Sequence, residues 1–474
     1  APDRPLPPTT ASFPPVSICR CLLRQPVSIA HLRPQQLPLQ RPPSLADFRP
    51  ARLPTCVAHL PVSGPLATRT ATSRAPICGF PAALCAAEFP HRPRAELEPK
   101  IVAADKLLTT AGGNYFDMPI RMDGALRKMP SGRTDSIMPP IFGASHASNL
   151  LELPDGTLLL VWFSGGDEGG DGVGIVSSLL PPGSAHWTKP ILASSQRMRS
   201  AQNPVTFYEP SENVVRLLHT SQEAYMGQGT AEVRLVESFD GGKSWKTPKT
   251  LFTEEGAFVK NQLLRSRDGK EWLLPMYYTP TGFLGHDTQY STVKRSGDGG
   301  RTWTEYVMDG SLGRCVQPTV VRLRSGTLRA WFRSRDADYI YTSDSKDDGR
   351  TWSRPVATRL PNNNSGIQAA MLKSGAVVMV FNNYQGADAR YPLTIALSPD
   401  EGATWPHLRD LEPAGDGEEA DYEEQMGEYS YPSVIQTADG ALHVSYTFRR
   451  ESIRYARISE DWIRQGATIG VFKS

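Results

Sequence analysis

The sequence predicts an all-β fold, a six-bladed β-propeller, and three observations lead to this prediction. A turn motif of the form Ser-x-Asp-x-Gly-x-Ser/Thr-Trp occurs four times, at 238–245, 296–303, 345–352 and 398–405. Its tryptophans are 58, 49 and 53 residues apart. From about residue 140 the chain divides into six units at a similar spacing, each with two β-rich runs around a turn, which fits four short strands per unit.

The residue types within one copy of the motif fit a tight turn. The carboxylate of Asp240 can accept hydrogen bonds from backbone N–H groups across the turn, and Gly242 can take the positive φ angle that such a turn needs. Trp245 then re-enters a strand and packs its ring under the turn. Because four hairpin tips cannot all be one reactive centre, the motif predicts structure and not catalysis.

The hairpins of the six units have Gly, Asn or Asp at the turn and Val, Leu, Trp or Tyr after it, and they lie at 154–165, 211–221, 268–278, 325–334, 374–383 and 439–448. Trp187, 58 residues before Trp245, and Trp462, 57 residues after Trp405, are interpreted as degenerate first and sixth copies of the motif. Residues 100–140 are expected to supply a strand that closes the ring against the last blade. A seventh blade built from this segment is the main alternative, and a solenoid is a weaker one.

The N-terminal part differs from the rest in composition. Residues 1–94 hold 11 Arg, no Lys and three acids, a charge of +8, so the remainder of this +2 chain carries 2 − 8 = −6. Twenty of the 41 prolines lie in the first 100 residues, where no hydrophobic periodicity is visible. We therefore expect a disordered arm at 1–95 and a propeller at 100–474. A targeting segment, a weak polyanion binder and a non-native extension are alternatives for the arm.

Five of the six cysteines lie in this arm, and the predicted propeller contains only Cys315, so it cannot form an internal disulfide. Cys19 and Cys21 are separated by one residue and have no matching pair, which does not fit a metal site. No metal cluster, phosphate loop or nucleotide motif is evident, so no cofactor is expected. The sequence contains no run of about 18 apolar residues, so no membrane-spanning helix is expected.

Propeller geometry predicts which face carries function. The start of the first run and the end of the second run of each unit lie opposite the repeated turns, and both places are polar here. The residues expected to line this face include His146, Asp167, Glu168, Asn203, His219, Lys260, Arg314, Gln317, Arg333, Asn364, Arg390, Tyr429 and Tyr431. Asn and Gln at strand starts also satisfy edge backbone groups, and surface arginines are often simply solvated. His146, Arg314 and Arg333 are the stronger candidates of their types.

The four repeated turns are similar to the Asp-box, or BNR, repeats of sialidases. Three longer stretches, 145–169, 360–383 and 428–455, resemble the sialidase-like BNR-repeat family of bacteria, fungi and plants. The likeness covers about residues 140–465. It implies a propeller, a carbohydrate substrate and an acidic sugar.

The resemblance also implies roles. Sialidases hold a sugar carboxylate with three arginines, use a Tyr–Glu pair as nucleophile and use an Asp as acid/base. The tyrosine should open the last blade, where Tyr429 and Tyr431 follow Glu428, while Asp167 or Glu168 in a Gly-rich loop matches the acid. Arg314 and Arg333 match carboxylate ligands, and the further substrate contacts would be Asn203, His219, Gln317, Asn364 and Arg390. The early Phe/Tyr-Arg-Ile-Pro motif of sialidases is absent, since Arg121 stands in a different context, so the resemblance does not extend to the full arginine triad.

Three hypotheses follow. The first is a glycoside hydrolase that cleaves an acidic terminal sugar, with a tyrosine nucleophile beside Glu428. The second is an exo-lyase, because the segments SHASN, LLHTSQ and WFRSR are similar to enzymes that remove rhamnose from glucuronate. There Arg314 and Arg333 would neutralise the uronate carboxylate, His146 would be the base, and His219 or Tyr431 would protonate the leaving oxygen. The third is a glycan-binding propeller without catalysis.

The expected partner is an acidic glycan, with no nucleic acid and no membrane, and we expect a monomer. An extracellular glycan favours secretion, although no signal-peptide pattern follows Ala1.

Overall fold

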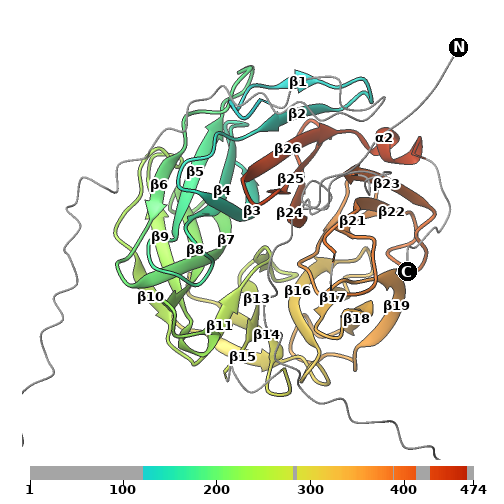
Figure 1. The fold of residues 1–474 in the computed structure, drawn as a ribbon. Coiled ribbons are helices and arrows are strands. Elements are labelled where there is room, and N and C mark those ends of the chain that lie inside the picture. Colours follow the sequence, from blue (N-terminus) through green and yellow to red (C-terminus); the bar gives the residue numbers. More distant parts are fainter. Residues whose placement is uncertain (1–120, 281–285, 388, 413–427, 467–474) are drawn as a thin grey trace, which may run out of the picture. The chain divides into compact units, whose positions relative to one another are not determined.

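A computed structural model describes residues 121–280, 286–387, 389–412 and 428–466, so the arm expected at 1–95 lies outside the described residues. The fold is an all-β propeller, as predicted: six antiparallel sheets form six blades around a common axis (Figure 1). Within the described residues, no helix has the length and apolar character that a membrane span requires.

Each of the first five blades follows the chain from its inner strand outwards. The first blade holds β3 (Ala144–Glu152), β4 (Leu158–Gly165), β5 (Gly174–Leu180) and β6 (Ile191–Ser194). The second holds β7 (Arg199–Glu209), β8 (Val214–Glu223), β9 (Glu232–Ser238) and β10 (Lys249–Phe252). The third holds β11 (Ala257–Val259), β12 (Leu264–Arg265), β13 (Trp272–Tyr278), β14 (Tyr290–Ser296) and β15 (Thr304–Val307).

The fourth blade holds β16 (Cys315–Arg322), β17 (Leu328–Ser334), β18 (Tyr339–Ser345) and β19 (Val356–Pro361), and the fifth holds β20 (Gln368–Met371), β21 (Val377–Asn382), β22 (Leu393–Ser398) and β23 (His407–Glu412). The sixth holds β24 (Tyr429–Gln436), β25 (Leu442–Phe448) and β26 (Ser452–Ile458). Apolar side chains of facing sheets fill the space between neighbouring blades; Val161 of the first and Leu217 of the second share one such cluster.

The sixth blade is completed by strands from the N-terminal side of the propeller. The strand β2 (Thr134–Ile137) pairs antiparallel with β26, and β1 (Arg127–Lys128) pairs with β2. The described part of the 100–140 segment therefore closes the ring, as expected, and forms no seventh sheet. Buried charges support this closure: Arg454 of β26 donates to Asp135 of β2 at 2.6 and 3.0 Å and to Glu412 of β23 at 2.7 Å.

The repeated turns lie between the third and fourth strands of the second to fifth blades, and their hydrogen bonds follow the expected pattern. In the first copy, Ser238 Oγ donates to Asp240 Oδ1 and accepts from the N–H of Gly242, both at 2.8 Å, and the N–H of Ser244 donates to Asp240 at 2.9 Å. Gly242 has a φ of 84°. The other three copies repeat these bonds.

The tryptophans differ in what they contact. The indole N–H of Trp303 and of Trp352 donates to the carbonyl of its own turn glycine, whereas that of Trp245 donates to Ser177 of the first blade at 3.0 Å. Trp187 lies in the loop between β5 and β6, next to an isolated bridge from His186 to Ala125.

The interpretation of Trp462 as a sixth copy of the motif is wrong. It lies in the short helix α2 (Glu460–Arg464), whose N-terminus is capped by Ser459. Because β2 already occupies the outer edge of β26, the chain after β26 does not return to the sheet and winds into a helix instead.

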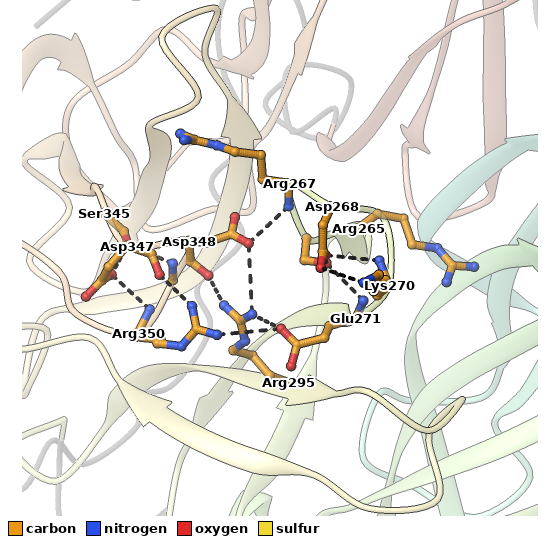
Figure 2. Close-up of polar contacts among 12 residues, drawn as sticks. Arg265, Arg267, Asp268, Lys270, Glu271, Arg295, Ser345, Asp347, Asp348 and Arg350 are labelled. Carbon is orange, nitrogen blue, oxygen red and sulfur yellow. Dashed lines mark hydrogen bonds and ion pairs between the residues drawn. The ribbon is translucent and has the colours of Figure 1, made fainter.

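The repeated turns also fasten neighbouring blades. The position after the motif aspartate has a left-handed backbone in all four copies; it is glycine in the first two and Asp348 (φ 65°) and Glu401 (φ 61°) in the others. Asp348 accepts from the backbone N–H of Arg267 in the third blade at 3.0 Å, and Glu401 accepts from that of Arg324 in the fourth at 2.7 Å. Figure 2 shows Arg295 reaching both Glu271 and Asp348 at this junction. These turns are therefore structural contacts between blades.

Candidate active site

The inner strands are irregular at one level, on the face opposite the repeated turns. A one-residue β-bulge interrupts four of them, at 146–149, 202–205, 316–319 and 430–433. Each bulge contains a non-glycine residue with positive φ: Ala147 (52°), Asn203 (48°), Gln317 (53°) and Tyr431 (51°). Such backbone is costly, and it persists where a bulge redirects a side chain.

The other two blades are irregular in a different way. In the third blade Lys260 and Asn261 fill the break between β11 and β12, and in the fifth Asn364 (φ 56°) precedes β20. All six blades therefore present polar side chains towards the axis at the same depth.

Tyr431 lies at the centre of this arrangement. Its ring is buried, and its hydroxyl oxygen accepts hydrogen bonds from Nη1 of Arg333 at 2.5 Å and from Nε2 of Gln317 at 3.4 Å. Nε of Arg333 donates to Asn364 Oδ1 at 2.8 Å, and the guanidinium of Arg390 lies 5.4 Å from the centre of the Tyr431 ring. Arg333 and Gln317 of the fourth blade and Arg390 of the fifth thus contact the Tyr431 side chain of the sixth blade, and Asn364 binds Arg333.

The charges around Tyr431 favour its phenolate form. Burial alone raises the pKa of a phenol, but the positive charges of Arg333 and Arg390 outweigh this effect and lower the pKa of Tyr431 below its ordinary value of 10.0. An arginine can only donate, so the bond from Arg333 is strongest when the oxygen carries negative charge. Tyr431 can therefore act as a nucleophile or as a base.

His146 lies against Tyr431. The two ring centroids are 4.3 Å apart, and Nδ1 of His146 is 2.7 Å from Thr447 Oγ1 and 3.5 Å from Glu428 Oε1. Nε2 is buried and has no hydrogen-bond partner in the described structure. Burial, and then the charges of Arg450 and Arg390, hold the pKa of His146 well below its ordinary 6.5, so the ring is neutral.

Glu428 is bound by arginines. It accepts from Arg390 at 2.5 Å, from Arg450 at 2.6 Å and from Ser430 Oγ at 2.7 Å. Although burial opposes this, the positive charges of Arg390 and Arg450 lower the pKa of Glu428. Arg450 extends the chain of ion pairs to Glu168 at 2.8 Å. These contacts place Glu428 beside His146, and its hydrogen bonds go to Arg390, Arg450 and Ser430.

The floor of the pocket includes a buried lysine. Nζ of Lys260 donates to the carbonyl of Pro432 at 3.3 Å and lies 5.7 Å from the Tyr431 ring centroid. Burial, and then the charge of Arg333, lower the pKa of Lys260 to about 7. A Cβ on Gly366 would lie 3.2 Å from Lys260, Gln317 and Tyr431, so a larger residue there would press on these three side chains.

The remaining predicted site residues are not all part of this cluster. Asn203 belongs to its wall, because its Nδ2 donates to the hydroxyl of Tyr277 at 3.3 Å. Asp167 is exposed in the loop between β4 and β5. The hydroxyl of Tyr429 lies 3.5 Å from Arg449 Nε, and the ring contacts Phe448.

Arg314 and His219 lie elsewhere. Arg314 is half-exposed and pairs with Asp336 and with the hydroxyl of Tyr341, both at 2.5 Å. His219 is buried between Ser194 Oγ at 2.9 Å and the carbonyl of Thr220 at 3.0 Å. Burial is the main cause that lowers the pKa of His219 to about 4.

Sequence reasoning missed Tyr277. Its hydroxyl accepts from Gln317 Nε2 at 3.1 Å as well as from Asn203, so it belongs to the same hydrogen-bonded wall as Tyr431. The neighbouring Tyr278 is instead a core residue stacked on Tyr290. Successive side chains of a strand point to opposite faces, so strict alternation along β13 could have indicated Tyr277.

The pocket has a surplus of positive charge. Lys260, Arg333, Arg335 and Arg390 surround Tyr431 or its neighbours, and the carboxylates of Glu428 and Glu168 lie near them. A cleft with charges of one sign attracts a ligand of the opposite sign. The arrangement therefore suits an anionic ligand with a reacting atom near Tyr431 and His146.

A second hollow, of about 570 Å³, lies at the other ends of the inner strands. Its lining is largely aliphatic, with Leu151, Leu264, Val321 and Met371 among its residues, and it includes none of the candidate site residues. This hollow is therefore separate from the cluster of cations around Tyr431.

Comparison with known proteins agrees with this architecture. Residues 156–444, more than half of the chain, match the model of the BNR repeat-like domain. The chain belongs to this sialidase-like BNR-repeat family. A sialidase of Bacteroides fragilis is 24% identical over 186 residues, which is 37% of this chain and 34% of the relative. The match thus spans about a third of that sialidase's length.

Solved structures share the fold of this BNR-repeat protein. The NanB sialidase from Streptococcus pneumoniae superposes with a TM-score of 0.56 at 12% identity, covering 68% of this chain and 69% of that one. The intramolecular trans-sialidase from Ruminococcus gnavus gives 0.54 at 13% identity, covering 68% and 96%. At these identities the likeness shows the propeller fold alone.

Proposed function

We propose that this protein is a glycoside hydrolase that removes a terminal acidic sugar, with Tyr431 as its nucleophile. The observation that carries the proposal is the buried phenol of Tyr431, which accepts a 2.5 Å hydrogen bond from Arg333 in a pocket rich in cations. A carboxylate nucleophile would place its negative charge against an anionic substrate, whereas the charge of a Tyr431 phenolate is balanced by Arg333 and Arg390.

In the proposed reaction the Tyr431 oxygen attacks the anomeric carbon of the sugar, and the bond from that carbon to the leaving oxygen breaks. Asp167 or Glu168, in the loop beside the pocket, protonates the leaving oxygen. Water then cleaves the glycosyl–tyrosine bond, so the configuration is retained overall. The proton that Tyr431 loses passes to solvent or to the neutral ring of His146, which lies against it.

The substrate carboxylate is assigned to the arginines. The guanidinium carbons of Arg333 and Arg390 lie 5.7 and 5.4 Å from the centroid of the Tyr431 ring, and both groups can offer forked donors to a carboxylate. A carboxylate bound there would partly neutralise the positive charge that Arg333 and Arg390 exert on Tyr431 and that Arg390 exerts on Glu428. Gln317 and Asn364 then remain as polar groups for sugar hydroxyls.

Product analysis tests the proposal. The protein is incubated separately with sialyl-oligosaccharides and with gum-type glucuronate glycans, and reducing ends, near-ultraviolet absorbance and the anomeric NMR signals of the first product are followed. New reducing ends with retained configuration and no gain in absorbance support the hydrolase. Release of no product from either class, together with binding, would identify a glycan-binding propeller instead.

One observation favours a second reaction, β-elimination from a uronate. Nε2 of His146 is buried without a partner next to Tyr431, in the position of a neutral base. In that reaction His146 takes the C5 proton, a C4–C5 double bond forms as the C4–oxygen bond breaks, and Tyr431 protonates the leaving oxygen. The unsaturated product absorbs in the near ultraviolet, so the same experiment separates the two reactions. Full lyase activity in His146→Ala would exclude this mechanism.

A further inference from the structure

Three large apolar side chains stand exposed on loops at the functional face. Tyr225 exposes 73% of its surface, Met226 60% and Met198 54%, and we call these three residues the exposed rim. Tyr225 and Met198 both have left-handed backbone, with φ angles of 66° and 58°. Exposed apolar groups held on strained backbone indicate a binding surface more than a folding requirement.

The backbone of the exposed rim is held firmly. The N–H of Tyr225 donates to the carbonyl of Gly169 at 2.8 Å, and the N–H of Met198 donates to Asp171 Oδ1 at 2.7 Å. The N–H of Ala224 donates to the carbonyl of Met198 at 2.9 Å, which joins the two loops of the second blade. An exposed aromatic ring on a fixed backbone is pre-organised for a ligand, because binding then orders few additional groups.

The exposed rim is continuous with the candidate active site. The loop between β4 and β5, whose Gly169 carbonyl accepts from the N–H of Tyr225, also carries Glu168. Glu168 pairs with Arg450, and Arg450 in turn binds Glu428 beside His146. On the inner side a Cβ on Gly169 would lie 3.0 Å from Gln222, and Gln222 accepts from Gln202 in the same bulge as Asn203. The loop between β4 and β5 thus contacts both the exposed rim and the ion pairs beside His146.

We propose that Tyr225 is the platform for a neutral sugar, the residue to which the acidic terminal sugar is attached; the proposal rests on the proposed function. A pyranose ring presents a face of C–H groups that packs on an aromatic ring, while its hydroxyls need polar partners at the edge. A Cβ on Gly170 would lie 3.3 Å from Tyr225 Cε1, so the ring lies along this glycine and keeps most of its surface open.

Charge selects a neutral sugar at this place. The loop segment 165–172 contains Asp167, Glu168 and Asp171 and no cation, in contrast to the arginine- and lysine-rich pocket. Carboxylates accept hydrogen bonds from sugar hydroxyls and repel a second acidic sugar. The site is therefore divided into a cationic pocket for the terminal sugar and the exposed rim, beside the exposed carboxylates of Asp167 and Asp171, for its neutral neighbour.

Ligand-detected NMR tests this inference without requiring turnover. Saturation-transfer difference spectra are recorded on the full chain with methyl β-galactoside, methyl β-glucoside and methyl α-rhamnoside as probes. At least one probe is expected to receive saturation mainly on the C–H protons of one ring face. Tyr225→Ala should reduce this signal about fivefold to tenfold. The matched control is Phe239→Ala, which removes another exposed aromatic ring, from the repeated-turn face, and should leave the signal unchanged.

The outcomes separate this inference from the proposed function. Saturation that persists in Tyr225→Ala, or no saturation with any of the three probes, overturns the platform even if the protein hydrolyses acidic glycosides. Saturation that depends on Tyr225 in a protein that cleaves no acidic glycoside supports the platform and rejects the hydrolase. Where glycan hydrolysis is observed, Tyr225→Ala should raise KM for a substrate with a sugar leaving group and leave kcat for a methyl glycoside of the acidic sugar unchanged.

Discussion

The imidazole of His146 and the phenol ring of Tyr431 lie with their centroids 4.3 Å apart at an interplanar angle of 51°. One residue comes from the first blade and the other from the sixth, the two blades that meet where the ring closes. Any chemistry at this pocket therefore depends on correct closure of the propeller, and the predictions below test the pocket and the closure separately.

Replacing Tyr431 by phenylalanine should abolish turnover and keep the fold. The variant retains the ring that packs on His146 and loses only the oxygen that Arg333 contacts. Loss of the reacting group is expected to lower kcat by about 10³-fold or more. Tyr429→Phe, which alters a hydroxyl beside Arg449, should reduce kcat far less. Steady-state kinetics on the substrate identified above gives the comparison, and equal losses in the two variants would contradict the assignment of Tyr431.

Replacing Arg333 by methionine should shift the pH dependence to higher pH. Arg333 is the largest of the charges that lower the pKa of Tyr431, so its removal lets that pKa rise towards 10.0. The activity that requires the phenolate should then appear at a pH about one unit higher than in the wild-type protein. The test is the pH profile of kcat/KM, with the phenolate absorbance of the resting protein as a second readout. An unchanged profile, with only KM affected, would restrict Arg333 to substrate binding.

Replacing Lys260 by methionine should stabilise the protein, most strongly at neutral and lower pH. The pKa of Lys260 is lowered from 10.5 to about 7 in the folded protein, so between these values the unfolded chain binds the extra proton. The stability of the wild-type protein relative to the variant is therefore lowest below pH 7 and rises as pH increases towards about 10. Urea denaturation should show a difference in unfolding free energy of about 2 kcal/mol or more at low pH that shrinks at high pH. A difference that is constant across this range would argue against a buried titrating lysine.

Replacing Arg454 by methionine should weaken ring closure. Arg454 is buried between Asp135 of β2 and Glu412 of β23, and its loss removes an ion pair from each of these buried carboxylates, which leaves Asp135 with Arg133 and Glu412 with the hydroxyl of Tyr446. We expect a loss of about 3–5 kcal/mol in unfolding free energy. Arg457→Met is the control on the same strand, since its ion pair with Asp439 is half-exposed and should contribute less than about 1 kcal/mol. Similar losses in both variants would show that the buried cluster does not hold the closure.

Several parts of the fold could be predicted from the sequence because they depend on local patterns. The four repeated turns have their hydrogen bonds within eight residues, so Asp240 and Gly242 could be assigned without any tertiary information. Their spacing fixed the number of blades and the face that lies opposite them. The Trp462 prediction failed because the fourth strand of the sixth blade is β2, which precedes the first blade in the sequence. No pattern in the residues around Trp462 indicates this pairing.

The membership of the pocket was decided by the tertiary structure. A strand presents alternate residues to each face, and a one-residue bulge reverses that alternation from the bulge onwards. The bulge at 430–433 brings Tyr431 to the axis while Tyr429 packs beside Arg449, and the break in the third blade buries Lys260 beneath it. The sequence by itself determined a propeller with a polar face, because the spacing of the repeated turns and the residue types within each turn are properties of short stretches of the chain. Only the tertiary structure brought Tyr431, Arg333 and His146 together, because bulges and ring closure depend on contacts between distant blades.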